Sequence, residues 1–300
     1  MHVIERFRGC LLGLAIGDAV GTTVEFQPRH SFPPVTDMVG GGPFNLKPGQ
    51  WTDDTSMALC LATSLIEIGG FDASDQMNRY CDWFDHGYLS STGQCFDIGN
   101  TVRQALVEYK SSGNPFSGST HPRSAGNGCL MRLAPVPMFY FPDFDRILQF
   151  SGESSRTTHG ATECVDACRL FGAMLFQAFS GASKSEILLS NPPEVVSSPS
   201  IQGIAKGTYR HKTVSEIQGT GYVVDSLEAA LWCFWTTETY GQAILAATNL
   251  GDDADTTAAI CGQIAGAYYG ESGIPKHWLN QITLQQEIAK LAEQLCTADP

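Results

Sequence analysis

The chain has 300 residues, of which 43% are hydrophobic, and a formal net charge of −13 with a pI near 4.8. This length and composition are sufficient for one large core, and no linker or charged block divides the sequence, so a single domain over residues 1–300 is expected. The acidic balance argues against a surface that binds nucleic acid or an anionic membrane, and it does not identify a substrate.

The first predicted element is a helix at the start of the chain. The apolar residues that fall on one face of this helix are Ile4, Phe7, Leu11 and Leu14. Arg6 and Arg8 precede the apolar residues 10–16 and give a superficial likeness to a signal peptide. That run is short and is interrupted by Asp18, so an integral first helix explains it better. The apolar residues 258–269 are likewise too few to cross a bilayer, and no membrane span is expected.

Further helices are predicted from apolar residues spaced three or four apart. In chain order these are Met57, Leu61, Leu65 and Ile68; Val102, Leu106 and Tyr109; Cys164, Cys168, Phe171 and Leu175; Leu227, Leu231 and Phe234; and Ile260, Ile264 and Ala267. Gly69 and Gly70 should end the first of these helices, while Gly262, Gly266 and Gly270 should give the last a smooth face. Alternation typical of strands is nearly absent, so an all-α globular bundle is predicted.

Ten cysteines are scattered singly along the chain, without a Cys-x-x-Cys pair or the clustering with histidine that marks zinc sites. Most lie inside apolar helical stretches, as Cys60, Cys168 and Cys261 do. They are predicted to be reduced core residues, which favours a reducing compartment and hence a cytoplasmic location.

Three long irregular segments, residues 28–50, 112–129 and 190–220, are expected between the helices because they are rich in glycine, proline, serine and asparagine. Long loops in a compact domain usually carry function. The second segment contains Ser124 and ends in Gly126-Asn127-Gly128, whose small residues could let backbone N–H groups approach a phosphate. An ordinary tight turn is the alternative.

Two short acidic runs are the most informative feature of the chain. They are Trp-Thr-Asp-Asp-Thr at residues 51–55 and Gly-Asp-Asp-Ala-Asp-Thr at residues 251–256, and each opens a predicted helix. Five carboxylates and three hydroxyls in eleven positions offer only oxygen ligands, which magnesium, manganese and calcium prefer. Helix capping is the alternative, since Thr52, Asp53 and Asp54 would suit a helix start and contribute about 1 kcal/mol. Three crowded carboxylates repel one another unless a cation neutralises them, so the two runs together favour a metal site.

The order of motifs resembles the ADP-ribosylglycohydrolase family, most closely its dinitrogenase-reductase-activating, ADP-ribosylarginine-cleaving members. The motifs are Gly-Leu-Ala-Ile-Gly-Asp-Ala-Val-Gly at 13–21, Val-Glu-Phe at 24–26, Gly-Gln-Trp-Thr-Asp-Asp-Thr at 49–55, Asp-Ile-Gly-Asn-Thr at 97–101, Gly-Asn-Gly at 126–128 with Met131-Arg132, Thr158-His159, Gly-Tyr-Val-Val-Asp at 221–225 and Gly-Asp-Asp-Ala-Asp-Thr-Thr at 251–257. They run in order from Phe7 to about Trp278.

The resemblance implies an orthogonal all-α fold, two Mg²⁺ or Mn²⁺ ions, and an ADP-ribosylated protein or small molecule as substrate. It implies that the metal ligands are Thr52, Asp53, Asp54, Asp253, Asp255 and Thr256. It implies an ADP-ribose pocket of Gly99, Asn100, Ser124, Gly126, Asn127, Gly128, Met131 and His159, with Tyr222 stacked on the adenine. Glu25 and Asp97 match the acids nearest the scissile bond and are expected to be catalytic together with Asp54 and Asp253. Asp252 occupies a position where many relatives have glycine.

Each of these residues also has an ordinary structural interpretation. Tyr222 could be a core residue, His159 a buried hydrogen-bonding histidine, and Glu25 a solvated loop acid. Asp97 could cap the helix that follows it. Only their joint occurrence in the family's order favours the functional interpretation.

The sequence therefore predicts a binuclear metal-dependent hydrolase that cleaves the N-glycosidic bond between ADP-ribose and a protein side chain, with arginine the expected target. Paired ions could orient the ribose and activate water, and Glu25 or Asp97 could steer that water or hold the departing guanidinium. The alternatives are another ADP-ribosyl linkage (serine, nucleobase or free guanidine), a two-metal phosphohydrolase acting on a nucleotide sugar, and a non-catalytic ADP-ribose-binding protein.

Overall fold

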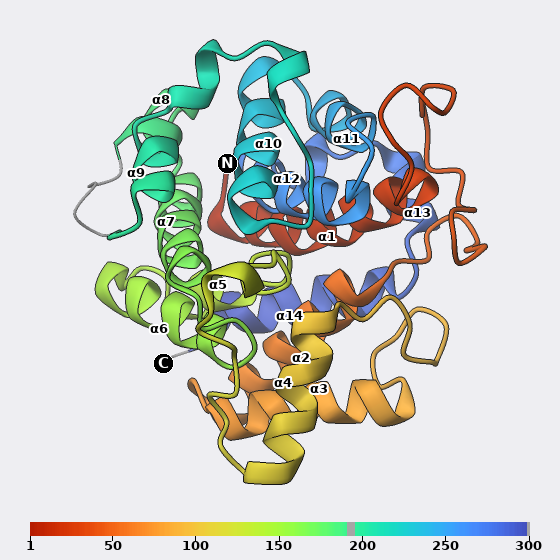
Figure 1. Ribbon diagram of the computed structural model, residues 1–300. Coiled ribbons are helices and arrows are strands. Elements are labelled where there is room, and N and C mark those ends of the chain that lie inside the picture. Colours follow the sequence, from red (N-terminus) through yellow and green to blue (C-terminus); the bar gives the residue numbers. More distant parts are fainter. Residues whose placement is uncertain (191–195, 299–300) are drawn as a thin grey trace.

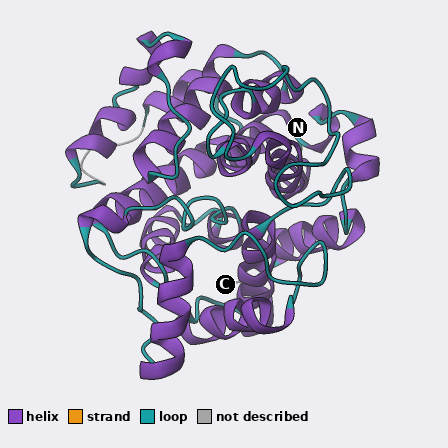
Figure 2. Cartoon of the chain, turned by 45° about the vertical axis from the view of Figure 1, so that its right-hand side comes forward, coloured by secondary structure: helices purple, strands orange, loops and turns teal. Residues whose placement is uncertain are grey.

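The computed structural model describes residues 1–190 and 196–298. In this part of the chain all regular secondary structure is helical, and no strand is present. Figure 2 shows helices joined by loops of very different lengths. The helices, in order, are α1 (Val3–Gly21), α2 (Asp53–Ile68), α3 (Ala73–His86), α4 (Asn100–Ser112), α5 (Pro135–Tyr140), α6 (Phe144–Arg156), α7 (Thr162–Phe179), α8 (Lys184–Leu189), α9 (Pro199–Ala205), α10 (Val223–Thr236), α11 (Tyr240–Thr248), α12 (Ala254–Tyr269), α13 (Lys276–Gln281) and α14 (Gln285–Thr297). The prediction of an all-α bundle is confirmed.

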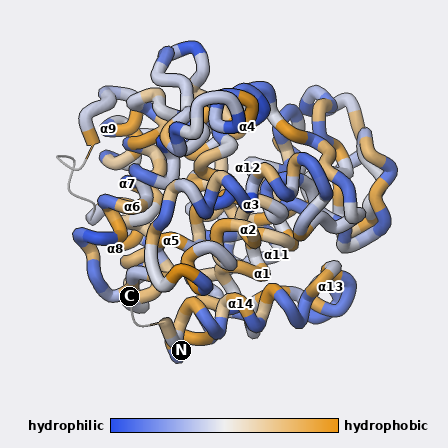
Figure 3. The backbone as a smooth tube through the Cα atoms, turned by 90° about the horizontal axis from the view of Figure 1, so that it is seen from below, coloured by the Kyte–Doolittle hydropathy of each residue, from blue (hydrophilic) through white to orange (hydrophobic). Residues whose placement is uncertain are grey.

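The helix α1 is buried along most of its length, as expected for an integral first helix rather than a removable leader. Every residue from 9 to 21 is buried. Among the described residues, the segment Val3–Val24 alone is long and apolar enough to span a membrane, and 89% of its most apolar stretch is buried inside the protein. Figure 3 shows orange, hydrophobic stretches on this helix and on α2 and α5. A helix that is apolar on all sides is typical of the centre of a large fold.

The helices α1 and α12 lie against each other in opposite directions (Figure 1). Glycines on one face of α1 make this close approach possible, since a Cβ on Gly13 would lie 2.4 Å from the Gly262 carbonyl oxygen, and one on Gly9 would lie 2.3 Å from that of Gly266. The smooth face predicted for α12 is confirmed at Gly262 and Gly266. Gly270 instead ends the helix, with φ +73, which a residue with a side chain adopts only at a cost.

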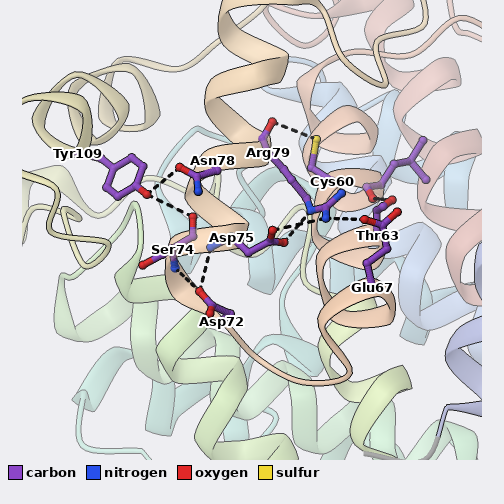
Figure 4. A network of polar contacts seen from close by, with 10 residues as sticks. Cys60, Thr63, Glu67, Asp72, Ser74, Asp75, Asn78, Arg79 and Tyr109 are labelled. Atoms are coloured by element: carbon purple, nitrogen blue, oxygen red, sulfur yellow. Dashed lines mark hydrogen bonds and ion pairs between the residues drawn. The ribbon is translucent and has the colours of Figure 1, made fainter.

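The helices α2, α3 and α4 enclose a second apolar cluster, which includes Met57, Trp83 and Leu106. Polar contacts join α2 to α3, because Arg79 contacts both Glu67 and Asp75 at 2.7 Å (Figure 4). At the end of α2, Gly69 has φ +73 and its N–H donates to the Leu65 carbonyl. The helix therefore ends at the Gly-Gly pair, as predicted. Ile68 departs from the predicted apolar face and is 50% exposed, because the last turn of α2 extends beyond the core.

The long loops agree with prediction only in part. Residues 28–50 form no helix. Ser112 still belongs to α4, and residues 113–129 contain only a short 3-10 turn, Pro122–Ser124. The segment 190–220 is not irregular throughout, because it contains α9 and 3-10 turns at Thr208–His211 and Val214–Glu216, while residues 191–195 lie outside the described part. Pro199 at the first position of α9 favours a helix start. The helix was not predicted because the segment is rich in polar residues and shows no clear apolar periodicity. All ten cysteines are free, and Cys60, Cys168 and Cys261 are buried as predicted.

Candidate active site

The first turns of α2 and α12 meet in the interior, although about 200 residues separate them in the chain. The Thr52 hydroxyl lies 3.3 Å from the Asp255 carboxylate, and the Thr256 hydroxyl lies 3.4 Å from the Asp54 carboxylate. Thr52, Asp54 and Asp255 are almost completely buried. The two acidic runs therefore form one cluster of oxygen atoms.

Helix capping does not explain these acidic residues. The α2 N-cap, Thr52, and the α12 N-cap, Asp253, make no side-chain cap hydrogen bond. Asp18 of α1 performs this task for α2 instead, accepting from the backbone N–H groups of Thr52 at 2.9 Å and Thr55 at 3.0 Å and from both hydroxyls. The carboxylates of the first turn of α2 are thereby left free to bind something else.

The cluster contains buried carboxylate oxygens that nothing in the described protein satisfies. Asp54 Oδ1 and Asp255 Oδ1 have no hydrogen-bond partner. Burial, followed by repulsion from neighbouring acids, raises the pKa of Asp53, Asp54 and Asp255 well above the usual range. Unpartnered buried oxygens in such a set suit hard divalent cations, which supply both the missing contacts and the missing charge. The residues present fit a metal group.

Glu25 and Asp97 extend this cluster toward the surface. One carboxylate oxygen each from Glu25, Asp97 and Asp255 lie within 4.8 Å of one another. Burial, then repulsion from Asp97 and Asp253, raises the pKa of Glu25 to about 10, and burial raises the pKa of Asp97 to about 7. Glu25 is only 3% exposed, so it is not a solvated loop acid. Asp97 does not cap α4, whose N-cap is Gly99.

A cavity of about 390 Å³ opens above the cluster. Of the residues expected to bind metal or substrate or to act in catalysis, those that line it are Glu25, Asp53, Asp97, Gly99, Asn100, Gly126, Asn127, Gly128, Met131, His159, Asp253, Asp255 and Thr256. Thr52 and Asp54 are buried residues outside this lining. No lysine or arginine is among the lining residues, so the carboxyl groups carry the formal charge of the cavity wall.

The Gly126–Asn127–Gly128 loop forms one wall of the cavity. Asn127 donates from its side-chain amide to the Asp253 carboxylate at 2.8 Å, which joins the loop to the acidic cluster. The backbone N–H groups of Gly126 and Asn127 are engaged within the protein, by the carbonyls of Ser124 and Gly221. The glycines instead allow close packing of His159, since a Cβ on Gly128 would lie 3.0 Å from the imidazole.

His159 is buried and hydrogen-bonded, and it also lines the cavity. Its Nδ1 lies 2.8 Å from the Thr158 hydroxyl, and burial lowers its pKa to about 4. The ring is therefore neutral near pH 7. The buried-histidine interpretation is correct for its environment, and the ADP-ribose contact that the family resemblance implied stays a prediction.

A second cavity, of about 660 Å³, shares Thr101, Gly126 and Gly221 with the first. Tyr222 and Ser124 line this second cavity. Tyr222 is 38% exposed and is therefore not a core residue, and its hydroxyl donates to Glu163 at 2.6 Å. The Ser124 hydroxyl donates to the His121 carbonyl at 2.7 Å. These two residues lie at the second cavity, away from the acidic cluster.

Asp18, Arg132 and Phe26 each have a place at the site that the sequence did not predict. Asp18 interrupted an apolar helix, which was the available signal. Arg132 is fully buried and Phe26 is exposed at the cavity, and neither environment is readable from a single chain. The Asp252 side chain is exposed and does not line the cavity. Its φ of +55 explains why glycine is suited to that position.

Comparisons with known proteins show the family of the chain. The family model described as ADP-ribosylglycohydrolase matches residues 1–300. The protein named ADP-ribosylarginine hydrolase Tri1 from Serratia proteamaculans is 47% identical over 97% of this chain and 79% of its own length, and the one from Pseudomonas putida is 46% identical over 100% and 80%. The ADP-ribosyl-[dinitrogen reductase] glycohydrolase of Rhodospirillum rubrum is 30% identical over 95% of this chain and 92% of its own.

A solved structure, titled ADP-ribosylglycohydrolase-related protein complex, superposes with a TM-score of 0.88 at 40% identity and covers 98% of each chain. The chain thus has the fold of a glycohydrolase enzyme. The chain belongs to the ADP-ribosylglycohydrolase family, and the family recognised from its motifs is confirmed.

Proposed function

We propose that this enzyme is a metal-dependent hydrolase that releases ADP-ribose from modified arginine side chains. One observation carries the proposal: two acidic helix starts converge on buried, unpartnered carboxylate oxygens beneath a cavity that adjoins a second cavity lined by Tyr222. The names of the two relatives at 46–47% identity support arginine as the linkage.

The residues that would hold two divalent cations are Thr52, Asp53, Asp54, Asp253, Asp255 and Thr256. Bound ions would neutralise this cluster, orient ribose hydroxyls and lower the pKa of a bound water. Magnesium and manganese both suit a ligand set made only of oxygen atoms. Asn127, through its bond to Asp253, would keep the substrate wall in register with the cluster.

Glu25 and Asp97 lie where the acidic cluster meets the cavity. Cleavage of a glycosidic bond develops positive charge on the sugar, which nearby carboxylates stabilise. The guanidinium of the modified arginine already carries its proton, so it departs as neutral guanidine and needs no strong external acid. We propose that these two acids, which bound cations and the guanidinium itself would keep ionised, hold the guanidinium and steer the attacking water.

The test is release of ADP-ribose from ADP-ribosylarginine by the purified chain with Mg²⁺ or Mn²⁺, followed by mass spectrometry, with a chelated sample beside it. Asp54→Ala and Asp253→Ala should abolish release while circular dichroism stays helical, because each removes a ligand rather than core packing. Turnover like that of the wild type in either variant, or after chelation, would refute the metal assignment.

The products also separate the alternatives. A phosphohydrolase would yield AMP and a ribose phosphate instead of intact ADP-ribose. A binding protein would take up ADP-ribose and release none from the modified arginine. A panel that includes ADP-ribosylserine tests the linkage.

A further inference from the structure

Phe26 is an exposed aromatic residue at the mouth of the candidate active site. It lines the same cavity as Glu25 and Asp97. Phe26 is 66% exposed, whereas its neighbour Glu25 is 3% exposed. Exposure of this ring forgoes the stabilisation that its burial would provide.

The backbone holds Phe26 in this place. Its φ is +62, in the left-handed region that residues with side chains rarely adopt. Its N–H donates to the Asp252 carbonyl at 2.7 Å, and the Asp252 N–H donates to the Gln27 carbonyl at 2.8 Å. This pair of bonds fastens the segment to the loop before α12, which also carries the acidic cluster. The exposed position of the ring is therefore imposed by the fold.

The next residues reinforce this attachment. Arg29 donates from Nε to the Leu250 carbonyl at 3.1 Å and from a terminal nitrogen to the Ile217 carbonyl at 2.5 Å. Gly251 packs directly on the same segment, since a Cβ there would lie 2.6 Å from the Gln27 carbonyl oxygen. Backbone strain that surrounding contacts hold in place is concentrated at active sites and ligand clamps.

The surroundings of Phe26 select for a flat cation. The cavity contains Glu25 and Asp97 and has no lysine or arginine among its lining residues. A guanidinium group is planar, weakly hydrated and permanently charged, so it can stack on an aromatic face while its N–H groups bond a carboxylate. A serine hydroxyl or a neutral base would gain less from this combination.

We propose that Phe26 is a specificity-determining residue whose ring stacks on the guanidinium of the ADP-ribosylated arginine, beside the Glu25 carboxylate. The inference deepens the proposed function and rests on it for the identity of the substrate. Phe26 takes no part in bond cleavage in this scheme. Its contribution is to the binding of the arginine half of the substrate and leaves the ADP-ribose half unaffected.

The experiment compares wild type, Phe26→Leu and Phe26→Tyr. Calorimetry on chelated protein, in which the ligand is not consumed, gives the affinities for ADP-ribosylarginine and for ADP-ribose. The ratio of the two affinities should fall by about tenfold in Phe26→Leu, which lacks the π face, and stay within about threefold in Phe26→Tyr, which keeps it. Leucine is chosen because it has no branch at Cβ to add strain at positive φ. The affinity for ADP-ribose alone should not change.

Tyr88→Leu is the matched control, because Tyr88 is also an exposed aromatic residue, at 37%, and lines neither of the two cavities. An unchanged affinity ratio in Phe26→Leu would overturn the inference. A loss of affinity for ADP-ribosylated proteins without a loss for ADP-ribosylarginine would also overturn it, because Phe26 would then be a protein-docking residue. Failure of the wild type to release ADP-ribose under Mn²⁺, with the ratio still dependent on Phe26, would overturn the proposed function alone.

Discussion

Arg132 shows how much of the site depends on a residue that never enters the cavity. Its guanidinium is fully buried, and its nearest hydrogen-bond partners are a carbonyl and a hydroxyl oxygen. It donates to the Gly128 carbonyl at 2.8 Å and to the Thr158 hydroxyl at 2.7 Å, and it lies 4.7 Å from the centre of the Tyr80 ring. Arg132 thereby connects the glycine loop to the residue that holds His159.

Replacement of Arg132 by methionine should therefore destabilise the protein and weaken ADP-ribose binding together. The Gly128 carbonyl and the Thr158 hydroxyl would each lose a partner, at about 1–3 kcal/mol per group. Urea denaturation measures the first effect and calorimetry the second. Arg169→Met is the control, since that side chain is 36% exposed. Equal stability of Arg132→Met and wild type would show that the loop does not depend on this contact.

Tyr222 can be tested in the same way at the second cavity. Tyr222→Ala should weaken ADP-ribose binding by about 1–3 kcal/mol, the scale measured for bases stacked on aromatic rings. Because the hydroxyl also bonds Glu163, Tyr222→Phe separates the two contributions and should retain most of the affinity. Unchanged affinity of Tyr222→Ala by calorimetry would exclude stacking on the adenine.

At the scale of elements, the contact between α1 and α12 positions the acidic cluster. The helix α1 carries Asp18, which orients the first turn of α2, while α12 carries Asp255. The two helices approach closely because Gly13 and Gly262 face each other's backbones. A change in their separation would displace Asp18 relative to Asp255.

Gly13→Ala should consequently lower the free energy of unfolding far more than the addition of one methyl group at an open position does. The new Cβ would lie 2.4 Å from a backbone oxygen that cannot move aside, and overpacking of this kind typically costs about 1–3 kcal/mol. Gly70→Ala is the matched control, because nothing lies within 4 Å of a Cβ at that position. Denaturation midpoints compare the two variants, and equal midpoints would contradict this account of the α1–α12 contact.

Prediction of elements from the sequence succeeded where the signal was local. Leu61 and Leu65 revealed α2 and Gly69 its end, because periodicity and a glycine cap are properties of a few adjacent residues. The failures were also local in origin. Ile68 continued the pattern past the core, and α9 was concealed by the proline and serine around it.

For the molecule as a whole, the excess of buried acid predicts a dependence of stability on pH and metal. Burial raises the pKa of Asp18 to about 6 and that of Asp97 to about 7, whereas both would titrate near about 4 when unfolded. Between these values the folded state binds more protons than the unfolded state. Stability without metal is therefore present at low pH and is lost as pH rises through 6 to 7.

Thermal unfolding of chelated protein should accordingly give a lower Tm at pH 8 than at pH 5. Added Mn²⁺ should raise Tm, and more so at pH 8, because the ions bind ionised carboxylates of the folded state. Glu67→Gln should leave this shift unchanged, since Glu67 is 60% exposed on the outside of α2. A Tm insensitive to Mn²⁺ at both pH values would contradict the metal site.

The sequence by itself determined the all-α class and the family, because helical periodicity and the ordered motifs are carried by neighbouring residues. Only the tertiary structure decided that Thr52 meets Asp255, that the Asp18 side chain rather than that of Thr52 caps α2, and that Phe26 is held exposed beside Glu25. Such relations depend on how closely two distant helices pack, and that distance is set by backbone contacts between glycines far apart in the chain.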